Sequence, residues 1–220
     1  MAYSAALIDF DGTLADSMPY WLRLPLDTLS RLGLPEPEGF RERISTRPMW
    51  EVAGYLSELY PTLTQKGLRD LWDGMMLENY RERILLKDGV RELLGLLRAR
   101  GVRLILLSAT RQPYLNGALE HFDLLREFEA VLTETETGAK HEPETFIRLA
   151  QRLGCAPEEL LLLEDSPPNL RAARAAGQTT VALYDASKPL WWEEIAAGAD
   201  AAMLSPADLL PLQKLLDERK

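Results

Sequence analysis

Six short apolar runs constrain the fold more than any other feature of the sequence. They cover residues 5–8, 102–107, 130–132, 160–163, 180–183 and 201–204. Each run is continuous rather than alternating, as expected for a parallel strand that is buried on both faces. From residue 86 onward the runs alternate with helical patterns at 89–100, 113–122, 143–153 and 169–176. This alternation predicts an α/β fold with a doubly wound, Rossmann-like parallel sheet.

The alternation is interrupted after the first run. Residues 15–85 contain helical stretches separated by breaks such as Gly33-Leu34-Pro35 and Tyr60-Pro61, but no strand pattern. About seventy residues is far more than the usual two to six of a strand-to-helix connection. We therefore expect residues 15–85 to form an inserted helical segment. Residues 1–14 and 86–220 should then form the α/β core.

The charge of the chain limits its partners. A net charge of −9 argues against nucleic acid or an anionic membrane, because such partners are bound through basic patches. A small phosphorylated molecule remains possible, since a metal and a few local cations can reverse the field at one site. The N-terminal residues lack the basic region of a signal peptide, and no stretch is long and apolar enough to span a bilayer. We expect a cytoplasmic protein, and these features leave its oligomeric state open.

Polar residues follow four of the runs, at the strand ends where open α/β sheets carry their active sites. These residues are Asp9, Asp11, Ser108, Lys140, Glu164 and Asp165. Carboxylates gathered at one edge suit a hard cation such as Mg²⁺. A serine hydroxyl and a lysine ammonium would complete a pocket for a phosphoryl group.

The pair of aspartates fits a two-step displacement. A carboxylate can attack phosphorus and form an acyl phosphate, which divides one difficult reaction into two easier ones. A second carboxylate two residues away can protonate the leaving oxygen and later deprotonate water. Taken alone, Asp9 and Asp11 could also be capping carboxylates of a turn, Ser108 a helix cap and Lys140 a solvated side chain.

In chain order, these residues resemble the four motifs of the haloacid dehalogenase superfamily. The matching motifs are Asp9-Phe10-Asp11-Gly12-Thr13-Leu14, Ser108, Lys140 and Glu164-Asp165-Ser166. The resemblance covers nearly the whole chain. Residues 15–85 resemble the helical cap of its phosphoglycolate phosphatase and beta-phosphoglucomutase branch.

This resemblance implies a Mg²⁺-dependent phosphatase that hydrolyses a small phosphorylated metabolite through an aspartyl-phosphate intermediate. Asp9 would be the nucleophile and Asp11 the general acid and base. Mg²⁺ would be held by the Asp9 carboxylate, the Asp11 main-chain carbonyl and Asp165, with Glu164 behind the metal. The phosphoryl group would be bound by two further catalytic residues, Ser108 and Lys140. One departure from the family pattern is His141, which stands where proline usually follows the motif lysine.

The cap should select the leaving group. Arg47 lies in a break between helical stretches and is our candidate for reading a second anionic group on the substrate. Trp21, Trp50 and Trp72 are expected to pack in the interior of the cap, as large aromatic residues do in helical subdomains. The substrate itself remains open among sugar phosphates, phosphoglycolate, nucleotides and cofactor phosphates.

Other functions fit less well. A phosphotransferase resembling beta-phosphoglucomutase would carry a histidine early in its first cap helix, and residues 16–21 contain none. Dehalogenase and phosphonatase relatives lack an aspartate at the position of Asp11. A phospho-receiver signalling domain would be much shorter and would carry its phosphorylated aspartate after a later strand.

Overall fold

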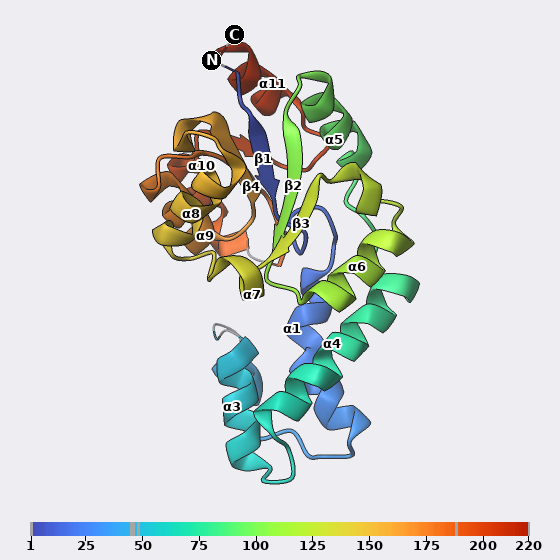
Figure 1. The fold of residues 1–220 in the computed structure, drawn as a ribbon. Helices are drawn as coiled ribbons and strands as arrows, with labels where there is room; N and C mark the ends of the chain where they lie inside the picture. Colours follow the sequence, from blue (N-terminus) through green and yellow to red (C-terminus); the bar gives the residue numbers. More distant parts are fainter. Residues whose placement is uncertain (1, 45–46, 48, 188, 220) are drawn as a thin grey trace.

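The computed structural model describes residues 2–44, 47, 49–187 and 189–219, and its centre is a six-stranded sheet (Figure 1). The strand order is β3-β2-β1-β4-β5-β6, and all neighbours are parallel. The strands are β1 (Ala5–Ile8), β2 (Arg103–Ser108), β3 (Ala130–Thr133), β4 (Leu160–Glu164), β5 (Thr179–Leu183) and β6 (Ala201–Met203). Each predicted run forms a strand whose ends lie within one residue of the prediction. The predicted fold class is confirmed.

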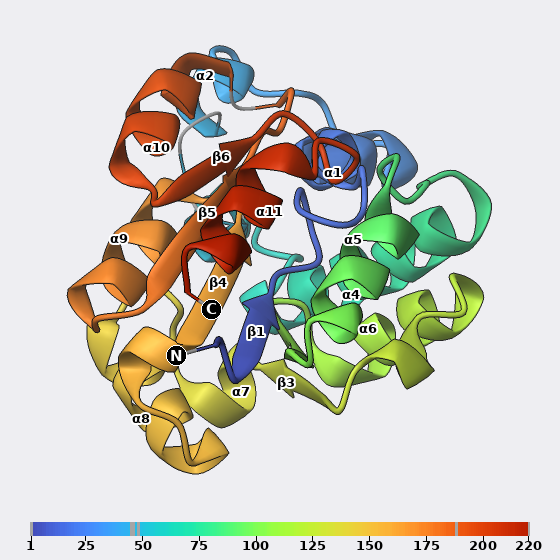
Figure 2. The ribbon, with the colours of Figure 1, turned by 90° about the horizontal axis from the view of Figure 1, so that it is seen from above.

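Helices cover both faces of this sheet, as Figure 2 shows from above. One face carries α5 (Val90–Ala99), α6 (Gln112–His121) and α11 (Leu210–Asp217), and the other carries α8 (Pro143–Leu153), α9 (Pro167–Ala175) and α10 (Trp192–Gly198). Ala6 and Ile8 of β1 enter the first apolar cluster, whereas Ala5 and Leu7 enter the second. Because both faces are buried, the strands need no polar alternation.

The remaining elements of the sheet region are short. They are the helix α7 (Glu134–Thr137) and three 3₁₀ turns at Leu125–Glu127, Pro157–Glu159 and Pro189–Trp191. The chain turns into α7 directly after β3, where the backbone N–H of Thr133 donates to Glu136 Oε2 at 3.1 Å. No helix in the described part of the chain has the length and apolar character needed to cross a membrane.

The described part of residues 15–85 contains four helices, which lie beyond the carboxyl ends of the strands (Figure 1). They are α1 (Met18–Arg31), α2 (Phe40–Ile44), α3 (Met49–Leu59) and α4 (Gln65–Glu82). Trp72 is buried among them as predicted, and Trp21 is half-buried. The prediction for Trp50 is wrong, because this residue is 64% exposed. It lies at the start of α3 and lines a cavity instead of packing in the interior of the helical segment.

The two connections between this helical segment and the sheet region run side by side. Ala15 forms an antiparallel bridge with Leu86. The Asp16 N–H donates to the Leu85 carbonyl at 2.9 Å, and the Lys87 N–H donates to the Leu14 carbonyl at 2.8 Å. The chain therefore leaves the sheet region and returns to it at one place.

Candidate active site

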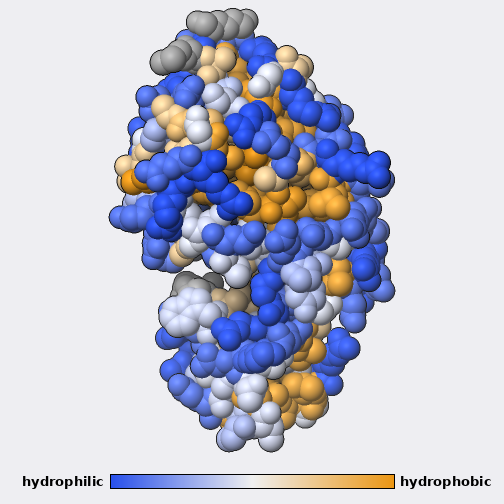
Figure 3. All heavy atoms as spheres, viewed as in Figure 1, coloured by the Kyte–Doolittle hydropathy of each residue, from blue (hydrophilic) through white to orange (hydrophobic). Residues whose placement is uncertain are grey.

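A cavity of about 810 Å³ lies between the strand ends and the helical segment. Figure 3 shows that the surface is hollowed between the part that carries the sheet and the part that carries α3. The six polar residues predicted at the strand ends all line this cavity: Asp9, Asp11, Ser108, Lys140, Glu164 and Asp165. The parallel sheet thus brings together residues that are up to 156 positions apart in the sequence.

The loop after β1 has a shape that only glycine allows at one position. Gly12 has a φ of +87°, and a Cβ atom built there would lie 2.5 Å from Oδ2 of Asp165. Glycine accepts this left-handed conformation without strain and leaves room for the neighbouring carboxylate. The first motif can therefore pass directly beside Asp165.

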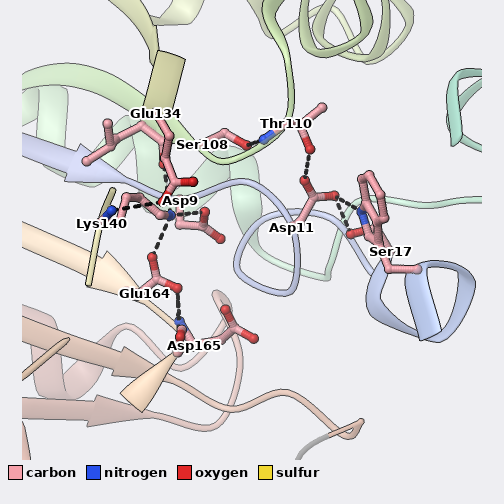
Figure 4. Close-up of polar contacts among 12 residues, drawn as sticks. Asp9, Asp11, Ser17, Ser108, Thr110, Glu134, Lys140, Glu164 and Asp165 are labelled. Carbon is pink, nitrogen blue, oxygen red and sulfur yellow. Dashed lines mark hydrogen bonds and ion pairs between the residues drawn. The ribbon is translucent and has the colours of Figure 1, made fainter. Parts of the chain in front are cut away.

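A buried ion cluster lies at the centre of the site (Figure 4). The Lys140 Nζ donates to Asp9 Oδ1 at 2.5 Å, to Glu164 Oε2 at 2.8 Å and to the Leu107 carbonyl at 3.2 Å. The side chains of Lys140, Asp9 and Glu164 are all nearly inaccessible to solvent. His141 in place of proline does not displace the lysine, whose backbone N–H donates to Glu134 Oε1 at 2.8 Å.

Burial changes the proton affinity of this cluster. It raises the pKa of Asp9 to about 7, with the Glu164 charge adding to the shift and Lys140 opposing it. Burial would lower the pKa of Lys140, but the Asp9 and Glu164 carboxylates outweigh it and hold that pKa above its usual value. The ammonium therefore stays charged, while Asp9 changes its charge close to neutral pH.

Asp9, Glu164 and Asp165 can bring one oxygen each to within 4.8 Å of one another. With all groups ionised, three carboxylates face a single ammonium, which leaves two negative charges that a divalent cation would balance. The buried Oδ2 of Asp9 has no hydrogen-bond partner among the described residues. Glu164 Oε1 accepts from the N–H groups of Asp165 and Ser166 at 3.2 and 3.0 Å. Both Glu164 oxygens are therefore engaged, whereas Asp9 Oδ2 is open to a cation.

Asp11 has different surroundings, and Figure 4 shows its carboxylate turned toward Thr110 and Ser17, away from Lys140. Its Oδ1 accepts from Ser17 Oγ at 2.7 Å, from Trp21 Nε1 at 3.1 Å and from the Tyr80 hydroxyl. Its Oδ2 accepts from Thr110 Oγ1 at 2.7 Å. All four partners are neutral donors, and three of them belong to the helical segment.

Ser108 is buried at the end of β2, and its Oγ accepts from the Thr110 N–H at 3.0 Å. This bond shapes the turn after β2 and leaves the hydroxyl proton of Ser108 able to donate to a ligand. His141 is exposed at the cavity edge.

The structure places two arginines of the helical segment differently. The guanidinium of Arg47 pairs with Glu51 at 3.0 Å, and Arg47 is not among the described residues that line the cavity. Arg69 lines the cavity and forms no ion pair with any described residue. The assignment of Arg47 to the leaving group stays a prediction, and the cavity wall favours Arg69.

Sequence reasoning missed the residues that surround the six predicted ones, namely Ser17, Trp21, Arg69, Tyr80, Thr110 and Glu134. Thr110 is two residues beyond Ser108 and could have been found as part of the same turn. The others offer no local signal, because only the tertiary fold brings them to the site.

Comparison with known proteins identifies the family. A model of the haloacid dehalogenase-like hydrolases matches residues 3–177. The chain is 28% identical over 186 residues to a phosphorylated carbohydrates phosphatase of Thermotoga maritima, covering 79% of this chain and 81% of the relative. It is 31% identical over 198 residues to a phosphoglycolate phosphatase of Salmonella paratyphi A, covering 80% and 79%.

A solved structure agrees with these sequence matches. CbbY from Rhodobacter sphaeroides, in complex with phosphate, is 25% identical and superposes with a TM-score of 0.77, covering 94% of this chain and 96% of that one. The four motifs, the parallel sheet and the matched residues lead to one conclusion: the chain belongs to the haloacid dehalogenase-like hydrolases, and the predicted phosphohydrolase of that family is confirmed.

Proposed function

We propose that the protein is a Mg²⁺-dependent phosphatase that hydrolyses a phosphate monoester of a small metabolite through an aspartyl-phosphate on Asp9. The observation that carries this proposal is the Asp9 carboxylate. It lines the cavity, its Oδ1 is held by Lys140, and its buried Oδ2 accepts no hydrogen bond from the described residues. A carboxylate held in this way is available both to a cation and to an incoming phosphorus atom.

The relatives support the substrate class. One is named for phosphorylated carbohydrates and another for phosphoglycolate, and CbbY was solved with phosphate. These substrates share a small organic leaving group on a phosphoryl group. The cavity offers a cation and a hydroxyl for the phosphoryl end, Lys140 and Ser108.

The chain's own residues account for both half-reactions. Asp9 attacks phosphorus, the bond from phosphorus to the leaving oxygen breaks, and Asp11 gives its proton to that oxygen. Asp11 then removes a proton from water, whose oxygen attacks the aspartyl-phosphate, so that phosphate leaves and the Asp9 carboxylate is restored. Ser108 donates to a phosphoryl oxygen, and the Lys140 ammonium offsets the negative charge gathered around phosphorus.

Mg²⁺ fits the acidic cluster described above. The Asp9 and Asp165 carboxylates and the Asp11 main-chain carbonyl would hold it, with Glu164 fixing the turn behind it. When bound, Mg²⁺ supplies positive charge that neutralises the phosphoryl oxygens.

We also propose that residues 15–85 form the cap and that residues 1–14 and 86–220 form the catalytic core. The paired connections at Ala15 and Leu86 support these boundaries. The cap contributes Met18, Met49, Trp50 and Arg69 to the cavity wall. Asp73 also lines this wall but is paired with Arg111, so Arg69 is the cation that would suit a leaving group with a second anionic group.

The test is turnover together with trapping of the intermediate. With Mg²⁺ the purified protein should release phosphate repeatedly from p-nitrophenyl phosphate, and EDTA should stop the reaction. Radiolabelled substrate should leave a hydroxylamine-sensitive label on the protein. Asp9→Asn should lose both turnover and label, whereas Asp16→Asn, which alters an exposed carboxylate of the same loop, should keep both. Near-normal turnover by Asp9→Asn, on protein checked for deamidation, would exclude Asp9 as the nucleophile.

A further inference from the structure

We infer that Tyr80 and Trp21 are positioning residues for Asp11: with Ser17 they hold its Oδ1, so that Oδ2 is the oxygen that carries the transferred proton. This inference rests on the proposed function, because it concerns the acid and base of that reaction. It assigns a role in the chemistry to two side chains of the cap helices that no motif contains.

The contacts converge on one oxygen. Oδ1 of Asp11 accepts from Ser17 Oγ at 2.7 Å, from Trp21 Nε1 at 3.1 Å and from the Tyr80 hydroxyl. The Trp21 Nε1–H also points at the Tyr80 oxygen, 3.3 Å away. Tyr80 is fully buried, and its ring packs against Phe10 with the ring centroids 5.7 Å apart. The aromatic ring thus fixes the hydroxyl beside the first motif.

The two carboxylate oxygens are therefore unequal. An ionised carboxylate offers about four acceptor sites on its two oxygens, and three donors already engage Oδ1. Among the described residues, Oδ2 accepts only from Thr110. Since a proton needs a vacant lone pair, Oδ2 is the atom that can bind one. In the first half-reaction that proton passes from Oδ2 to the leaving oxygen as the phosphorus–oxygen bond breaks.

The two aromatic residues can donate but cannot accept the proton of Asp11. Burial, with the Asp11 charge adding to it, raises the pKa of Tyr80 well above its usual value, so the phenol stays protonated. The indole of Trp21 is a donor only. They orient the carboxylate and do not extend a proton relay.

Leaving-group dependence separates positioning from mere packing. Departure of an alkoxide requires a proton, whereas p-nitrophenolate leaves as a stable anion. The value of kcat/KM covers the steps up to departure of the leaving group. A defect in the acid should therefore lower kcat/KM for glycerol 2-phosphate and spare p-nitrophenyl phosphate. A packing defect should lower both equally.

The experiment compares Tyr80→Phe with wild type on these two esters in Mg²⁺. The variant keeps the ring and loses the hydroxyl. We expect kcat/KM for glycerol 2-phosphate to fall roughly 10- to 100-fold, the worth of a hydrogen bond to a charged group. For p-nitrophenyl phosphate we expect less than about a threefold fall. Asp11→Asn should show the same selectivity with a larger loss.

Thr28→Val is the matched control. Thr28 is buried in α1 and accepts from Trp72 Nε1 at 2.7 Å, so its loss removes a buried hydrogen bond between the same two helices without touching Asp11. In Thr28→Val, kcat/KM should change by the same factor for both esters. Should Tyr80→Phe fold poorly, Ser17→Ala removes a smaller donor from the same oxygen and should show the same selectivity.

The inference is overturned if Tyr80→Phe lowers kcat/KM by the same factor for both esters, because only a packing role would then remain. The same outcome in Ser17→Ala counts if that variant replaces Tyr80→Phe. The proposed function is judged separately by Asp9→Asn on the same two esters. If that variant is inactive while Tyr80→Phe shows no selectivity, only the inference fails. If Asp9→Asn retains turnover, or wild type hydrolyses neither ester, both fail.

Discussion

Two aspartates separated by one residue occupy opposite kinds of surroundings. Asp9 lies among charges, with Lys140 at 2.5 Å and Glu164 and Asp165 close by. Asp11 lies among neutral donors from a serine, a threonine, a tryptophan and a tyrosine. Asp9 is therefore held mainly by charge, and Asp11 is held mainly by hydrogen bonds from neutral groups.

The difference follows from the elements that supply the partners. Glu164 and Asp165 lie at the end of β4, and Lys140 lies in the loop after β3 and α7, all at one edge of the parallel sheet. Most partners of Asp11 come from α1, α4 and the connection before α1. The orientation of the Asp11 carboxylate therefore depends on the position of the helical segment relative to the sheet. The cluster around Asp9 holds more carboxylates than cations and would gain from a further cation, whereas the partners of Asp11 are neutral donors.

The largest effect should come from removing the charge on the Asp9 side. Lys140→Ala leaves Asp9 and Glu164 buried without their ammonium, which should cost about 3–5 kcal/mol of unfolding free energy. Ser17→Ala, on the Asp11 side, removes one of several neutral donors and should cost only about 1 kcal/mol. Urea unfolding of the metal-free proteins at pH 8 measures both. Equal losses would mean that the two sites are not electrostatically different, and Lys66→Ala in an exposed pair serves as the control.

A smaller effect should appear in the pH dependence of metal binding. The pKa of Asp9 is about 7, so below that pH a proton competes with Mg²⁺ for this carboxylate. Mg²⁺ affinity should fall up to about tenfold per pH unit below 7 and level off above it. Calorimetric titration from pH 5.5 to 8.5 measures this, and Asp9→Asn should flatten the profile. A wild-type affinity independent of pH would contradict the raised pKa.

The raised pKa of Asp9 should also make the stability of the metal-free protein depend on pH. The folded pKa of Asp9 lies above its ordinary value of 3.8, so protonation favours the folded state. The stabilising contribution is full below that ordinary value and is lost as pH rises through about 7. Metal-free protein should therefore lose this contribution between pH 4 and 8, and Mg²⁺ should restore stability most strongly at the upper end.

The smallest effect concerns the wall that the helical segment adds to the cavity. Arg69→Ala should lower kcat/KM several-fold for a monoester whose leaving group carries a carboxylate, since an exposed ion pair is worth at most about 1 kcal/mol. p-Nitrophenyl phosphate has no second anionic group, so its turnover should barely change. Arg47→Ala, which breaks the pair with Glu51, is the matched control. If only Arg47→Ala changes the ratio between the two substrates, the original assignment of Arg47 is right.

The sequence was informative where one local pattern determined the structure. Buried strands require continuous apolar runs, so residues 160–163 could be placed within a residue, and the acidic pair after them followed at once. Weak local patterns were less informative. The helix α7 has only four residues, and α10 follows a 3₁₀ turn without an apolar period; neither was predicted.

Tertiary contacts also limited what could be predicted from the sequence. Tyr80 lies 69 residues from Asp11, on a helix whose pattern is that of any packed helix. Trp50 has a large aromatic side chain of the kind that usually packs in an interior, but it lies in the first turn of α3 beside the cavity. The packing of α3 against α4 determines this position. The domain boundaries and the roles of the individual site residues stay predictions until the variants are measured.

The bridge between Ala15 and Leu86 has a consequence for how enzymes of this shape can diversify. Because the two connections are already paired, the residues between them form a closed loop. Doubling the length of such a loop raises its closure free energy by only about 0.6 kcal/mol. A segment of another length or helix number can therefore occupy this place without rebuilding the strand ends. A new segment must bring its own donors for Asp11, however, so under the roles proposed above exchanging it would change substrate preference and proton transfer together.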